Sequence, residues 1–178
     1  MKTGRIPFKR STFALLILLL LIFSFRLGSY LLLPSEPVAL LPGLRYSGGP
    51  IESVFRLGLP KKVDSHLSDW REVLYVFESE LDGSPVEIKL CFTDSLWLTN
   101  MWVRAEAEDP GKAKLLFEAW CDRLEAAYRE NEGYRNHGTI DTCNGKELRM
   151  EIDKGALGLI CTITLEGSLV SFYGENIW

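Results

Sequence analysis

An apolar stretch near the N-terminus constrains this chain more than any other feature. From Thr12 to Phe25 the sequence holds 14 residues without a charge, and after Arg26 the apolar character continues to Leu33, where Pro34 ends any helix. As one helix, residues 12–33 would measure about 33 Å at about 1.5 Å per residue, enough to cross the hydrocarbon core of a bilayer. We therefore predict a single transmembrane helix over residues 12–33 that serves as an uncleaved signal-anchor.

A cleaved signal peptide is the alternative for the same stretch. An uncharged run of 14 residues behind a basic leader also fits the apolar core of a secretion signal. The best candidate for a cleavage site, Leu27-Gly28-Ser29, has a leucine where a small residue is needed. In this alternative the rest of the chain is secreted after cleavage.

The charge distribution predicts which way the chain crosses the membrane. Residues 1–11 form a basic leader with four cationic side chains and no acid. Since cationic flanks stay in the cytoplasm, we expect a single-pass protein with a cytoplasmic N-terminus and an extracytoplasmic C-terminal domain. Residues 34–178 hold 15 of the 20 Lys and Arg and all 24 Asp and Glu, a net charge near −9. This acidic part lacks the basic face that nucleic acids require, so we expect the lipid bilayer, through residues 12–33, and no nucleic acid as a partner.

The remainder divides into a tether and one domain. Residues 34–50 contain four prolines and three glycines, which predicts an extended tether, although its apolar side chains are also suited to lie on the domain or the bilayer. Residues 51–178 have the size of a single extracytoplasmic domain with one core.

The first half of this domain contains a hairpin whose register can be tested. Folding the chain about Asp82-Gly83 sets Phe77 opposite Ile88 and makes one face apolar throughout. A second turn at residues 94–95 then sets Ile88 opposite Met101. We predict three antiparallel strands here, preceded by a further strand at residues 51–59 and a short helix near residues 64–70.

A long amphipathic helix follows these strands. Glu108 or Asp109 suits its N-cap, Pro110 its first turn and Gly133 its end. An apolar stripe runs along it at helical spacing, which predicts packing across one face of the sheet. The stripe consists of Ala113, Leu116, Phe117, Trp120, Cys121, Leu124, Ala127 and Tyr128.

The second half predicts about four more strands. A three-residue turn at residues 144–146 opposes Ile140 to Met150 and Asp141 to Arg149, and we prefer it to a two-residue turn because it separates apolar from charged side chains. Later turns set Met150 opposite Leu159 and Ile163 opposite Val170. The predicted fold class is α+β: a transmembrane helix, then a mostly antiparallel sheet in the order βββ-α-ββββ with one long helix on one face.

Two groups of residues are candidates for a site. If disulfides form outside the cytoplasm, the face assignments favour Cys121–Cys161 and Cys91–Cys143, and the alternative is four thiols that pack as small hydrophobic groups. An apolar patch points away from the helix, and it marks an interaction surface if it is exposed. We expect residues 51–70 to fold back over it as a second layer through Ile51, Val54, Phe55, Leu57, Leu67 and Trp70. The patch consists of Leu74, Val76, Leu96, Leu98 and Trp102.

The residue patterns favour a non-catalytic role. We find no GxSxG, HExxH, P-loop or CxxC spacing, and therefore predict no catalytic residue, cofactor or metal. The expected function is a protein-interaction or accessory module whose partner is a membrane or envelope protein. The alternative is a small-ligand-binding protein or hydrolase with a pocket between helix and sheet, lined by Tyr75, Trp97 and Trp120.

Overall fold

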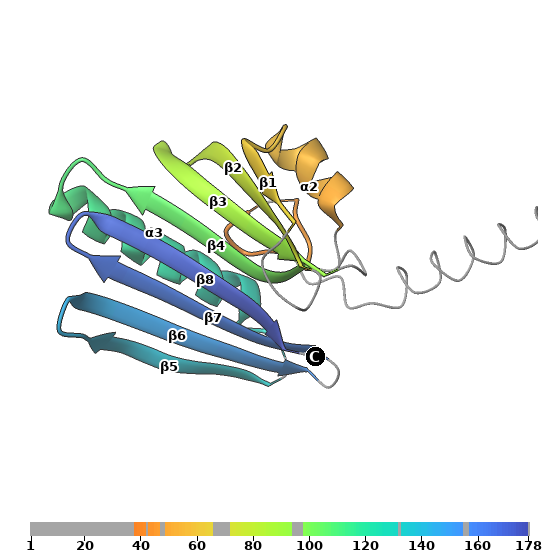
Figure 1. The fold of residues 1–178 in the computed structure, drawn as a ribbon. Coiled ribbons are helices and arrows are strands. Elements are labelled where there is room, and N and C mark those ends of the chain that lie inside the picture. The colour runs from red at the N-terminus through yellow and green to blue at the C-terminus, as the bar shows by residue number, and fades with distance from the viewer. Residues whose placement is uncertain are drawn as a thin grey trace, which may run out of the picture. The chain divides into compact units, whose positions relative to one another are not determined.

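The computed structural model describes residues 38–41, 43–46, 49–65, 72–93, 98–131, 133–154 and 157–177 (Figure 1). The chain divides between Pro34 and Ser35 into two units, and every described residue belongs to the second unit. The predicted leader and transmembrane helix, residues 1–33, lie outside the described residues. In the part that is described, neither helix has the length and apolarity needed to cross a bilayer.

The domain is an α+β fold with one eight-stranded antiparallel sheet and two helices. The helices are α2 (Pro50–Leu57) and α3 (Pro110–Tyr128). The strands are β1 (Lys62–Asp64), β2 (Val73–Leu81), β3 (Ser84–Phe92), β4 (Leu98–Glu106), β5 (Tyr134–Asp141), β6 (Gly145–Lys154), β7 (Leu157–Glu166) and β8 (Leu169–Ile177). Four strands precede α3, where the sequence predicted three, and four follow it.

The strand order places the two halves of the domain side by side. Across the sheet the strands run β1-β2-β3-β4-β8-β7-β6-β5, so β4 pairs with β8 at the centre (Figure 1). The four strands before α3 form one side of the sheet and the four after it form the other. Helix α3 connects β4 to β5 and packs against β7 and β8 on one face. We call the face that carries α3 the inner face, and the opposite face the outer face.

The first hairpin has the predicted register. Phe77 lies opposite Ile88, and the turn residues Asp82 and Gly83 have φ angles of 54° and 76°. Positive φ at both central positions is the geometry of a two-residue type I′ turn, which matches the twist of the flanking strands. The same register sets Glu78 directly opposite Glu87 on the outer face.

The pairing of β3 with β4 differs from the prediction by two residues and contains a bulge. Ile88 lies opposite Val103, not Met101. Asn100 pairs with Cys91 but Leu98 pairs with Phe92, so Thr99 is an extra residue, and its hydroxyl donates to the Cys91 carbonyl at 3.1 Å. A bulge reverses which face the following side chain takes, and Leu98 therefore lies in the core, 2% exposed, rather than on the outer face.

The turn between β5 and β6 is shorter than predicted and lies earlier, because only Cys143 and Asn144 separate the paired residues Thr142 and Gly145. Thr142 and Gly145 exchange backbone hydrogen bonds across the loop, and Ile140 lies opposite Glu147 instead of Met150. Ile140 is consequently 56% exposed. Asp141 pairs with Lys146 at 3.7 Å, and the predicted partner Arg149 instead contacts Glu151 at 2.8 Å.

The remaining two hairpins keep the predicted faces with shifted partners. Met150 pairs with Cys161 and Ile163 with Phe172, each two residues from the predicted register. Because side chains alternate with a period of two, a two-residue shift leaves every side chain on the same face.

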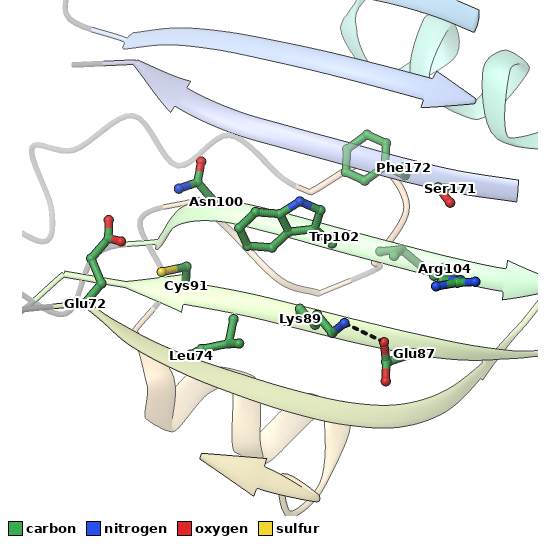
Figure 2. Close-up of a pocket in the computed structure, with 11 residues that line it drawn as sticks. Glu72, Leu74, Glu87, Lys89, Cys91, Asn100, Trp102, Arg104, Ser171 and Phe172 are labelled. Carbon is green, nitrogen blue, oxygen red and sulfur yellow. Dashed lines mark ion pairs between the residues drawn. The ribbon is translucent and has the colours of Figure 1, made fainter. Parts of the chain in front are cut away.

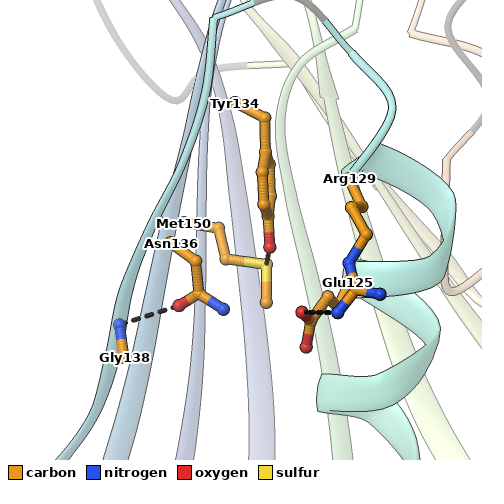
Figure 3. A network of polar contacts seen from close by, with 6 residues as sticks. All are labelled: Glu125, Arg129, Tyr134, Asn136, Gly138 and Met150. Carbon is orange, nitrogen blue, oxygen red and sulfur yellow. Dashed lines mark hydrogen bonds and ion pairs between the residues drawn. The ribbon is translucent and has the colours of Figure 1, made fainter.

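Helix α3 is confirmed in position and orientation. The Asp109 carboxylate caps it by accepting from the Lys112 N–H at 2.9 Å, and Trp120, Leu124 and Tyr128 are fully buried against the sheet. Figure 3 shows its C-terminal end, where Glu125 and Arg129 form an ion pair at 2.5 Å.

The start of β5 packs beneath this end of α3. The Tyr134 hydroxyl donates to the Met150 sulfur at 3.6 Å (Figure 3). Two residues along, the Asn136 side chain accepts from the Gly138 N–H at 2.7 Å. Gly138 has a φ of 76° and lies where the β5–β6 register shifts, so the amide stabilises the irregular backbone there.

A segment that the sequence assigned to the tether contributes to the core. Its five large apolar side chains are at most 4% exposed, namely those of Val38, Leu40, Leu41, Leu44 and Tyr46. The Ala39 N–H donates to the Tyr128 hydroxyl of α3 at 3.1 Å, which fixes the segment to the helix layer. Burial raises the pKa of Tyr46 well above its usual value. The core of the domain therefore begins by residue 38 and not at residue 51.

The predicted strand at residues 51–59 is a helix instead. Pro50 begins α2 at a position where its missing N–H costs nothing, and Gly58 ends it with a φ of 88°. Val54 and Leu57 pack against the core cluster on the inner side. Short strand β1 follows, so Asp64 lies in a strand and not in the predicted helix, most of which lies outside the described residues.

Candidate functional site: the outer face of the sheet

The outer face carries a hollow over β2, β3, β4 and β8. It has a volume of about 520 Å³ and is lined by residues of these strands together with Glu72. Figure 2 shows Trp102 at its centre, with Lys89 on the neighbouring strand and Asn100 and Arg104 on either side along β4. The alternation of β4 explains this arrangement, because Met101, Val103 and Ala105 point into the core and leave the residues between them outside.

Trp102 rests against Tyr173 of β8. These residues are direct cross-strand partners, and their ring centroids lie 5.4 Å apart at an angle of 36°. The Tyr173 hydroxyl lies 3.1 Å from both Asn100 Oδ1 and Glu175 Oε2. Burial and the Glu175 carboxylate raise the pKa of Tyr173 to about 12, so the hydroxyl stays protonated and can donate to these oxygens. The indole is therefore supported on one side while 36% of Trp102 remains exposed.

Charged side chains of both signs border the aromatic pair. Lys89 contacts Glu87 at 2.8 Å (Figure 2), and this hydrogen bond, with Arg104 nearby, lowers the pKa of Glu87. Arg104 is exposed and forms no ion pair with any residue that the structure describes. Glu78, opposite Glu87, is paired with Lys61, which relieves the repulsion between the two facing carboxylates.

The other end of the hollow is less polar at its floor. Cys91 is 3% exposed there, and burial, with the nearby Glu72 carboxylate, raises its pKa to about 11. A thiol with this pKa remains protonated and unreactive near neutral pH. The hollow therefore offers an aromatic surface with a cation at one end and a carboxylate at the other, and its Cys91 thiol is not an activated nucleophile.

The predicted patch is only partly brought together. Leu74 and Trp102 line the hollow, and Val76 lies on the same face beside it, 7% exposed. Leu98 lies in the core because of the bulge, and Leu96 lies outside the described residues.

Sequence reasoning missed the contribution of β8. The alternation around Phe172 does place Ser171, Tyr173 and Glu175 on the outer face. Without the strand order, however, nothing in the sequence brings them next to Trp102.

Within the described residues, the segment expected to cover this patch does not do so. Val54 and Leu57 pack against the core, while Ile51 and Phe55 remain 72% and 84% exposed. The other residues proposed as a cover, Leu67 and Trp70, lie outside the described residues.

All four cysteines are described, and each carries a free thiol. Cys91 on β3 and Cys143 in the β5–β6 loop are separated by the intervening strands β4, β8 and β7, so a bridge between them would require the sheet to rearrange. Cys161 is buried beside the Tyr46 hydroxyl, and Cys121 is half-buried on α3. Burial raises the pKa of both Cys121 and Cys161 to about 12. Cys91, Cys121 and Cys161 thus pack among apolar neighbours, whereas Cys143 is exposed, and the formation of disulfides outside the cytoplasm stays a prediction.

Of the three residues proposed to line a pocket between α3 and the sheet, the structure describes Trp120 and Tyr75. Trp120 is fully buried, and its indole N–H has no hydrogen-bond partner among the residues that the structure describes. Tyr75 packs edge-on against Phe92 at 5.6 Å. Trp97, the third residue proposed for a pocket there, lies outside the described residues. Among the described side chains no cluster of three or more potential metal ligands occurs.

Comparison of the chain with family models, curated proteins and solved structures finds no match.

Proposed function

We propose that this protein is a non-catalytic interaction module, anchored in a membrane by residues 12–33, and that it binds a membrane or envelope protein through the hollow around Trp102. The observation that carries the proposal is the exposure of an indole at the centre of a sheet face, braced by Tyr173 and bordered by charges. Tryptophan and arginine are enriched among residues that dominate binding at protein interfaces, and both occur here as Trp102 and Arg104.

The chemistry of the hollow indicates what a partner presents. An apolar or aromatic side chain would fill the space against Trp102, and an acidic neighbour would pair with Arg104, which lacks an ion pair among the described residues. The same space, at about 520 Å³, also falls within the range of small-ligand sites, so a small molecule is the rival occupant.

Site-specific photo-crosslinking tests the proposal in native membranes. A benzophenone amino acid at position 102 should give a discrete crosslinked species with a protein. The same residue at position 115, on the solvent-exposed side of α3 and 67% exposed, should not. Trp102→Ala should weaken recovery of that partner at least about tenfold, as expected for a central anchor. Equal crosslinking at both positions, or none at position 102, would refute the binding surface.

Membrane anchorage has its own test. Intact mass of the protein purified from membranes should equal that of the full chain, allowing for processing of the initiator methionine. A species shorter by about 29 residues would instead indicate signal cleavage and a released domain.

A further inference from the structure

Helix α2 carries apolar side chains on two sides. Val54 and Leu57 pack against the core, but Ile51, Phe55 and Leu59 are 72%, 84% and 87% exposed. Ile51 and Phe55 are four residues apart and therefore lie one above the other on the helix surface, and Leu59 follows just after the helix ends. We call these three residues the α2 stripe.

The α2 stripe differs from the scattered apolar exposure that folded proteins normally have. Seven large apolar side chains are exposed in the described part of the chain, and three of them fall within residues 51–59. The other four are isolated on β1, β4, α3 and β5. Such clustering of Phe, Leu and Ile marks a surface that contacts a partner or a membrane.

The position of the stripe along the chain indicates which of these it contacts. Val38 is fixed in the core, and the predicted transmembrane helix ends at Leu33. The five residue steps between them span at most about 18 Å, so the folded domain is held close to the bilayer surface. So short a connection between Leu33 and Val38 gives the domain an effective concentration at the membrane in the millimolar range or above. Even a weak contact with the membrane surface can therefore stay formed.

We propose that the α2 stripe docks on the lipid surface of the bilayer that anchors the chain. This inference rests on the anchorage in the proposed function and adds an orientation for the domain. Ile51, Phe55 and Leu59 enter the boundary between headgroups and acyl chains, as the apolar flank of an interfacial helix does. The charged flank of α2, with Glu52 and Arg56, remains among the headgroups. Because residues 34–178 carry a net charge near −9, insertion of apolar surface and not attraction to anionic lipid drives this contact.

Depth-dependent quenching in vesicles tests the proposal with the full chain. A Cys143→Ser background removes the exposed thiol, and Phe55→Cys then provides a single accessible site for an environment-sensitive fluorophore. The matched control is Leu115→Cys, which is also an exposed apolar position, on α3. Each labelled chain is reconstituted into phosphatidylcholine vesicles with and without lipids that carry a quencher near the top of the acyl chain.

The label at position 55 should lose about half of its fluorescence and the label at position 115 less than about a tenth, since interfacial helices bury their apolar flank about 5–10 Å deep. Adding Ile51→Glu to the position-55 chain should reduce the quenching at least about twofold. Equal quenching at both positions, or none at position 55, would overturn the proposal. If position 55 is not quenched by lipid but is shielded when a second protein is present, the α2 stripe binds a protein.

Flotation of the same vesicles after alkaline washing separates this inference from the anchorage. If the chain floats with the lipid but position 55 is not quenched, docking of the α2 stripe is refuted while anchorage stands. If the chain does not float, both are refuted.

Discussion

Leu40 provides a sharp test of whether the segment at residues 38–46 belongs to the folded domain. Its side chain is fully buried in the core cluster, although it lies in the stretch whose prolines and glycines predicted a tether. Leu40→Ala removes buried carbons and leaves a cavity, at a cost of about 2–5 kcal/mol. Leu59→Ala makes the same chemical change at a position that is 87% exposed, and should alter stability by less than about 0.5 kcal/mol.

The difference is large enough to measure by thermal unfolding. A domain of about 140 residues has an unfolding entropy near 0.3 kcal/mol/K, so a loss of about 3 kcal/mol lowers Tm by about 10 °C. Leu59→Ala should lower it by less than about 2 °C. The assay is tryptophan fluorescence of the full chain in detergent, where Trp120, fully buried beneath α3, reports loss of the core.

Two outcomes would refute the reasoning. If Leu40→Ala and Leu59→Ala shift Tm equally little, the segment is a tether that contributes nothing to the core. If Leu59→Ala is as damaging as Leu40→Ala, the α2 stripe is buried in the folded domain and the assignment of exposure is wrong.

The remaining predictions concern the α3 cap, two glycines and the thiols. Asp109→Ala should cost about 1 kcal/mol by removing the N-cap of α3, and Asp109→Asn should restore most of it in denaturant titration. Gly133→Ala should cost more than about 3 kcal/mol, because a Cβ there would lie 1.9 Å from the Asp153 carbonyl oxygen and φ is +81°. Gly138→Ala, with a similar φ of +76° but open space, should cost only about 1 kcal/mol, and equal costs would contradict this account. Brief alkylation at pH 8 should modify only Cys143 in the folded chain and all four thiols after unfolding. The raised pKa of Cys91, Cys121 and Cys161 means that the unfolded chain loses these protons first, so stability should fall as pH rises from about 9 towards 12 and remain unaffected by this cause below pH 8.

The elements that sequence reasoning located correctly have strong local determinants. The Asp82-Gly83 turn requires positive φ at both positions, which pins the register of the flanking strands to one solution. Helix α3 has a capping aspartate, a proline in its first turn and a long apolar stripe, and each of these signals acts without help from the rest of the fold.

The strand register was predicted incorrectly where the only signal was the alternation of side chains. A shift of two residues satisfies that alternation equally well, so the pairing of Ile88 with Val103 and of Ile163 with Phe172 could not be distinguished from the predicted alternatives. The bulge at Thr99 leaves no local mark in the sequence, and it moved Leu98 from the candidate site into the core. Strand β8 contributes Ser171 and Phe172 to the lining of the hollow and Tyr173 as the support of Trp102, and its adjacency to β4 depends on the strand order of the whole sheet.

Sequence reasoning missed helix α2 and the buried segment at residues 38–46 for a related reason. Val38, Leu40 and Tyr46 become core residues through contacts with distant parts of the chain, such as the hydrogen bond from Ala39 to Tyr128, 89 positions away. Composition alone assigned this stretch to a tether, because prolines and glycines dominate it and tertiary burial has no local period there.

The central position of β8 has a consequence for how this domain is made. Residues 169–177 are synthesised after all seven other strands, yet they occupy the middle of the sheet and pair with β4 on one side and β7 on the other. Until they emerge from the ribosome, β4 and β7 each present an unpaired edge. The two halves of the sheet therefore cannot pair with each other before β8 is made. When β8 inserts between β4 and β7, it joins them in a single late folding step that brings together residues far apart in the sequence. A nascent chain arrested just before residue 169 would expose two unpaired strand edges at once. This stage of synthesis therefore carries the greatest risk of aggregation, and it is the stage at which a chaperone would act.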